Sequence, residues 1–183
     1  MDELIAELAA SGVVALPGRP PVMCPTEAAV LSVCQPEDGR IDEIINLADP
    51  GARHLVNDAF LQLASRFGLF GEHGDFLLAV NYERDGLGDD VQWIRVRLAD
   101  SWDMAGGYYG TICGPSGDGL LAMSLDGKLI MSATTYESGL ASVIALPDPH
   151  RAAPVRRAVG YLLDSKKTPD TEKETIRAWL DQD

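Results

Sequence analysis

The sequence predicts an α+β fold in which an antiparallel meander of about five or six strands carries N-terminal and C-terminal helices on one face. The spacing of apolar residues is helical over much of residues 1–70, alternates over residues 76–146 and becomes helical again over residues 151–183. The turns between the alternating segments are too short for the crossovers that join parallel strands. A chain of 183 residues fits one compact unit, so we expect a single domain over residues 1–183.

The helices are predicted from apolar residues that recur every three or four positions. The clearest run extends from Ala52 to about Phe67, where Gly68 follows as a C-terminal cap. A short amphipathic helix is expected over residues 2–10, and residues 26–33 fit a brief helix or a strand equally well. Two C-terminal helices are expected over residues 154–163 and 169–180.

The strands are predicted from apolar runs and from strict alternation of apolar and polar residues. The candidate strands are residues 76–82, 91–98, 120–125, 129–135 and 140–146, with a short sixth segment at residues 108–113. Residues 41–47 form a further apolar segment. Asp126-Gly127-Lys128 separates two of these runs, and Asp-Gly in that position is a strong hairpin signal.

The charge and cysteine content narrow the class of protein. Twenty-eight acids against 15 Lys and Arg give a net charge of −13, which repels nucleic-acid phosphates and anionic lipids. No stretch of about 18 uncharged apolar residues is present, so we expect no membrane span. Three cysteines without a C-x-x-C motif favour free thiols in a reducing compartment, and we expect a cytoplasmic protein that binds neither nucleic acid nor membrane.

Motifs for catalysis or cofactor binding are incomplete. Ser116 lacks the glycine two positions later that a nucleophile elbow needs, and Gly106–Gly110 lacks the order of a dinucleotide-binding loop. His54 and Asp58 have a spacing compatible with metal ligands but no second pair, and the acidic loop over residues 85–90 departs from the EF-hand order. We therefore predict no catalytic residue, no metal site and no cofactor.

Two sets of residues suit protein binding better. Trp93, Arg95 and Arg97 alternate onto one side of a strand, and Trp102 follows in the next loop. Tryptophan and arginine are enriched at binding hot spots, although the same pattern fits a solvated face whose arginines pair with acids. The second set consists of carboxylates that would attract a basic partner, namely Glu37, Asp38, Asp42, Glu43, Asp85, Asp89 and Asp90.

One segment resembles a known family. The run from Gly117 to Leu129, GDGLLAMSLDGKL, is similar to the Gly/Asp-bounded hairpin of SUKH-type immunity domains. The resemblance implies a toxin-neutralising α+β domain with a sheet flanked by helices. The aromatic-rich early motif of that family is absent from residues 1–70.

These observations favour a non-enzymatic, acidic protein-binding domain, of the kind of a bacterial immunity or inhibitor protein that occludes a basic toxin. Two alternatives remain open. The first is a small-molecule-binding domain or enzyme with a site near the Gly106–Gly119 loops and Arg95/Arg97. The second is an accessory or chaperone-like subunit that uses the sheet edge or the last helix.

Overall fold

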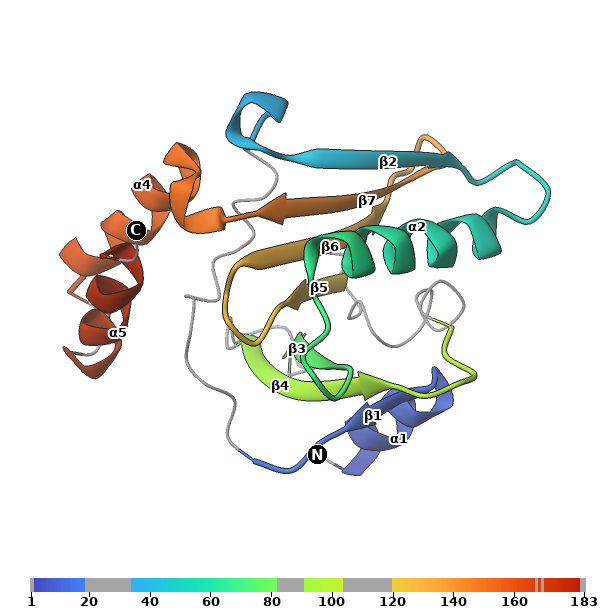
Figure 1. The fold of residues 1–183 in the computed structure, drawn as a ribbon, viewed down its shortest axis with the longest axis horizontal. Helices are drawn as coiled ribbons and strands as arrows, with labels where there is room; N and C mark the ends of the chain where they lie inside the picture. Colours follow the sequence, from blue (N-terminus) through green and yellow to red (C-terminus); the bar gives the residue numbers. More distant parts are fainter. Residues whose placement is uncertain are drawn as a thin grey trace.

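The computed structural model describes residues 2–18, 34–81, 91–103, 120–166, 168 and 170–181 (Figure 1). The helices are α1 (Asp2–Ala10), α2 (Ala52–Phe67), α4 (Ala153–Asp164) and α5 (Asp170–Leu180), with short 3-10 helices η2 (Pro36–Asp38) and η4 (Pro149–Arg151). The strands are β1 (Val13–Ala15), β2 (Ile41–Asn46), β3 (Asp75–Asn81), β4 (Val91–Leu98), β5 (Leu120–Met123), β6 (Leu129–Thr135) and β7 (Leu140–Pro147).

The strands form one antiparallel sheet in the order β1-β4-β3-β5-β6-β7-β2. The predicted α+β class with an antiparallel sheet is confirmed. The sheet has seven described strands rather than five or six, because β1 and β2 add to its two edges (Figure 1). The expected meander holds only from β5 to β7, since β5 pairs with β3 and leaves β4 to pair with β1.

The hairpin between β5 and β6 forms as the Asp-Gly signal predicts. Gly127 has a φ of 72°, a left-handed conformation that glycine adopts without a steric penalty. Asp126 Oδ1 accepts from Ser124 Oγ at 2.7 Å and from the backbone N–H of Lys128 at 3.1 Å. These local bonds hold the turn and fix the register of two buried strands.

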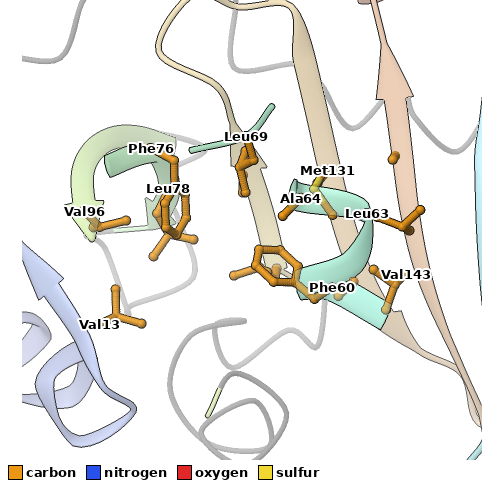
Figure 2. Close-up of a cluster of buried hydrophobic side chains, with 14 of the residues drawn as sticks. Val13, Phe60, Leu63, Ala64, Leu69, Phe76, Leu78, Val96, Met131 and Val143 are labelled. Carbon is orange, nitrogen blue, oxygen red and sulfur yellow. The ribbon is translucent and has the colours of Figure 1, made fainter. Parts of the chain in front are cut away.

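Helix α2 covers one face of the sheet. Its bounds match the prediction, and it lies between two glycines in the left-handed conformation, Gly51 and Gly68. The buried residues Phe60, Leu63 and Ala64 face Met131 and Val143 of the sheet (Figure 2). This cluster, which also includes Val13, Phe76, Leu78 and Val96, is called the first core.

Helices α4 and α5 cover the opposite face, which corrects the expectation that the helices share one face. Val155 and Val159 of α4 and Ile176 and Trp179 of α5 are buried with Leu77, Met123, Ile130 and Leu146 of the strands. This cluster is called the second core. Adjacent residues of β3, such as Leu77 and Leu78, enter different cores because neighbouring side chains of a strand point to opposite faces. Within the described part of the chain, no helix has the length and apolar character needed to cross a membrane.

Candidate functional site

An exposed isoleucine lies among acidic residues at one edge of the sheet. Ile44 of β2 is 67% exposed, whereas Ile45 is 8% exposed and belongs to the first core. We refer to residues 36–46, which include η2 and β2, as the β2 edge. This edge contains four of the predicted binding carboxylates and one arginine: Glu37, Asp38, Asp42, Glu43 and Arg40. β2 is the outermost strand on its side of the sheet (Figure 1).

The turn before β2 places Glu37 and Asp38 next to the strand. Pro36 begins the 3-10 helix, and the backbone N–H of Gln35 donates to Asp38 Oδ2 at 2.9 Å. Gly39 then adopts a φ of 89°, which turns the chain into β2. Glu37 is exposed. The local bonding therefore uses one carboxylate of the turn and leaves the other directed to solvent.

Arg40 and Asp42 form a two-bond ion pair at the start of β2. Arg40 Nη2 donates to Asp42 Oδ1 at 2.6 Å, and Arg40 Nε donates to Asp42 Oδ2 at 2.8 Å. Arg40 Nη1 also donates to the carbonyl of Cys34, and Ser142 Oγ of β7 donates to Asp42 Oδ1 at 3.3 Å. The hydrogen bond to Asp42 is the main cause that raises the pKa of Arg40 above its ordinary value.

The pair leaves Glu43 and Glu37 as the exposed carboxylates of the β2 edge. Glu43 is exposed on the strand itself, and neither residue forms an ion pair with any residue that the structure describes. Their charges are therefore available to attract a cationic group, whereas the charge of Asp42 is already matched by Arg40.

Cys34, which precedes this edge, is a free and fully buried thiol. Burial raises its pKa, the charge of Asp38 raises it further, and Arg40 opposes the change. The thiolate is the reactive form of cysteine, so a raised pKa makes Cys34 a poor nucleophile. Cys34 therefore acts as a small apolar residue of the second core, as expected for a free thiol.

On β4, Arg95 is paired with a buried acid. The carboxylate of Asp75, which is 2% exposed, accepts a hydrogen bond from Nε of Arg95 and forms an ion pair with its Nη2. Burial alone raises the pKa of Asp75, but the bond to Arg95, a backbone bond and the charges of Arg95 and His73 outweigh it and lower the pKa overall. For Arg95, this observation favours the interpretation in which an arginine of this face pairs with an acid.

The aromatic residues beside these arginines contribute to the cores. Trp93 is half-buried against the second core, and its Nε1 has no hydrogen-bond partner among the described residues. Trp102 packs on the first core, with its ring centroid 6.2 Å from that of Phe60. The two tryptophans therefore lie at opposite faces of the sheet and do not share one surface. Arg97 is exposed on β4.

No family model, curated protein or solved structure matches this chain. Three predicted binding carboxylates, Asp85, Asp89 and Asp90, lie outside the described residues, as does the Gly106–Gly119 segment. Within the described ranges, no group of three His, Cys, Asp or Glu side chains is placed to hold a metal ion.

Several residues that form ion pairs in the structure were not singled out from the sequence. Asp75 and Arg40, which form the two best-defined ion pairs described above, were not predicted from the sequence. Asp103 joins the segment after β4 to α2, because its carboxylate accepts from Asn57 Nδ2 at 2.9 Å and pairs with Arg53. The i, i+2 spacing of Arg40 and Asp42 was a usable signal, since such residues share one side of an extended chain.

Proposed function

We propose that this protein binds a positively charged protein partner through the β2 edge, and that it acts as a bacterial immunity or inhibitor protein does, by covering the active surface of a basic toxin. The observation that carries the proposal is Ile44, a large apolar side chain that is 67% exposed and follows Asp42 and Glu43 on the outermost described strand of the sheet. An exposed apolar side chain with charged residues nearby is compatible with a protein interface, whose buried centre is apolar and whose rim is polar.

Electrostatics supports a basic partner rather than an acidic one. The whole chain carries −13, and the β2 edge adds the exposed carboxylates Glu37 and Glu43 to that field. Opposite charge raises the association rate and makes it fall with ionic strength. The free buried thiol of Cys34 supports a reducing compartment, for which we propose the cytoplasm.

Site-specific photo-cross-linking in the native host tests this proposal. A photoreactive residue replaces Ile44 in one variant and Tyr161 of α4, which is 74% exposed, in the control. We expect position 44 to capture a basic protein at low salt, and position 161 to capture none. Equal capture from both positions, or capture that does not depend on salt, contradicts the proposal.

A matched pair of charge variants separates the β2 edge from the overall charge. Glu37→Lys with Glu43→Lys, and Glu72→Lys with Glu174→Lys, each raise the net charge by four, from −13 to −9. We expect the first pair to reduce capture at position 44 by about tenfold, because it removes charge at the interface, and the second to reduce it much less. If both pairs of substitutions reduce capture equally, the binding surface lies outside the β2 edge.

A further inference from the structure

On the side away from β7, the backbone of β2 has hydrogen-bonding groups that no described strand pairs with. The N–H of Leu47 donates to the carbonyl of Gly139 at 2.9 Å, in register with the pairs from Ile41–Ala145 to Asn46–Leu140. Bonded and non-bonded pairs alternate along an antiparallel ladder. Residues 41, 43 and 45 therefore bond to β7, and residues 42, 44 and 46 direct their N–H and C=O groups outward.

The hydrogen bonds between β7 and β6 lead to the same assignment of bonded and outward-facing residues. The N–H of Tyr136 donates to the carbonyl of Leu140 at 2.8 Å, so even-numbered residues of β7 bond to β6 and odd-numbered residues bond to β2. The carbonyl of Asn46 is used by the N–H of Asp49. Asp42 and Ile44 thus present two N–H and two C=O groups that no described strand pairs with.

The two edges of the sheet differ in how they are protected. β1 is three residues long, and Leu16 and Pro17 follow it directly. β2 has six residues and no proline, and it exposes Ile44. A long edge strand of this kind is a template for another strand. Glu37 and Glu43 make a second copy of this chain a poor occupant, because it would bring the same negative charges.

We propose that the partner inserts an extended segment of alternating basic and apolar residues along β2 as an added strand, paired with Asp42 and Ile44; this inference rests on the proposed function. Side chains alternate between the faces of the added strand. Apolar residues of the segment pack on Ile44 on one face, and basic residues meet Glu43 on the other. The backbone bonds provide affinity, and the two faces provide selectivity.

A defined peptide tests the added strand. The probe is a nine-residue peptide of alternating lysine and valine, and the control is the same peptide N-methylated at alternate positions, which blocks pairing along one edge. Amide hydrogen exchange of the full chain is measured by NMR. With the probe at saturation we expect exchange at Asp42 and Ile44 to slow by about tenfold or more, and exchange at Glu43, already bonded to β7, to change little.

Two further arms complete the experiment. An alternating glutamate and valine peptide should give no protection, because its charge matches that of the β2 edge. Ile44→Ala keeps the backbone N–H and should retain protection at Asp42, whereas Ile44→Pro removes that N–H and should lose it. Fluorescence anisotropy of the labelled peptides gives binding independently of the exchange measurement.

The outcomes distinguish the two proposals. Binding of the lysine–valine peptide without protection of Asp42 and Ile44 overturns strand addition and leaves the basic-partner proposal intact. Equal binding of the N-methylated peptide, or no binding of the probe at millimolar concentration, also overturns strand addition. The cross-linking experiment at position 44 decides the proposed function separately.

Discussion

Gly12 connects α1 to β1 at a point where the chain passes very close to the segment after β4. Its φ is 71°, and a Cβ added there would lie 2.5 Å from Cα of Trp102. The backbones are also bonded, since the N–H of Ala99 donates to the carbonyl of Gly12 at 2.8 Å. A side chain at this position therefore meets backbone that cannot move aside without breaking that contact.

We expect Gly12→Ala to lower the free energy of unfolding by about 3 kcal/mol, from left-handed strain of about 1–2 kcal/mol and overpacking of about 1–3 kcal/mol. Gly139→Ala is the matched control, because Gly139 has a φ of 80° but nothing within 4 Å of the added Cβ. Urea denaturation measures both variants. Equal losses in the two variants would show that the close approach to Trp102 contributes nothing.

The Asp75–Arg95 pair predicts a pH dependence of stability. The folded-state pKa of Asp75 lies below the unfolded value of about 3.9, so folding favours the ionised form. Its contribution is present above the unfolded pKa and is lost as the pH falls through the lower folded value. At neutral pH we expect Asp75→Asn to cost about 1–3 kcal/mol, because Arg95 loses its charged partner.

Acid denaturation tests whether the pKa of Asp75 is lowered in the folded state. The wild-type protein should lose stability between pH 5 and pH 3 more steeply than Asp75→Asn, which lacks this titrating group. The control is Asp100→Asn, because Asp100 is exposed and its replacement should leave the wild-type slope. Parallel curves for wild type and Asp75→Asn would contradict the lowered pKa of Asp75.

Single-residue roles of this kind were only partly predictable. The four carboxylates of the β2 edge were chosen as candidate binding residues because they are acidic and lie at or near a turn, and their role in binding stays a prediction. That Asp42 is paired and Glu43 is not depends on where Arg40 and Ser142 lie in space. Asp75 and Arg95 are twenty residues apart, and only the pairing of β3 with β4 brings them together.

Because side chains alternate between the two faces of β2, two neighbouring isoleucines should differ in how much they contribute to stability. Ile44→Ala removes a side chain that is 67% exposed and should change the free energy of unfolding by less than about 0.5 kcal/mol. Ile45→Ala removes a buried member of the first core and should cost about 2–4 kcal/mol. Thermal denaturation of both variants measures these two losses of stability. A larger loss for Ile44 than for Ile45 would show that the strand faces the other way.

Helices and hairpins were predicted more accurately than the arrangement of the strands. The bounds of α2 follow from local periodicity and a capping glycine, and the Asp126-Gly127 turn follows from local backbone preferences. The coverage of both faces had a signal in the sequence, because β3 and β7 read as nearly continuous apolar runs rather than alternating ones. Such runs are typical of strands that are buried on both sides.

The order of the strands depends on contacts between distant segments, which local patterns do not encode. β5 pairs with β3 although β4 lies between them in sequence, and β2 pairs with β7 across about a hundred residues of chain. Alternating residues of β3, β5, β6 and β7 enter both cores, so the two cores share one sheet. Loosening one core therefore removes support from strands that the other core needs.

This coupling predicts a single unfolding transition seen from both sides of the sheet. Trp102 reports the first core and Trp179 the second, so two variants that each keep one of these tryptophans, with phenylalanine at the other two tryptophan positions, give separate fluorescence signals. In each variant the fluorescence midpoint should coincide with the midpoint of far-UV circular dichroism, as cooperative unfolding requires. Leu63→Ala, which truncates a first-core residue of α2, should cost about 2–5 kcal/mol by either reporter. If Leu63→Ala left the unfolding midpoint reported by Trp179 unchanged, the α4–α5 face would fold as an independent unit. The shared sheet would then not couple the two cores.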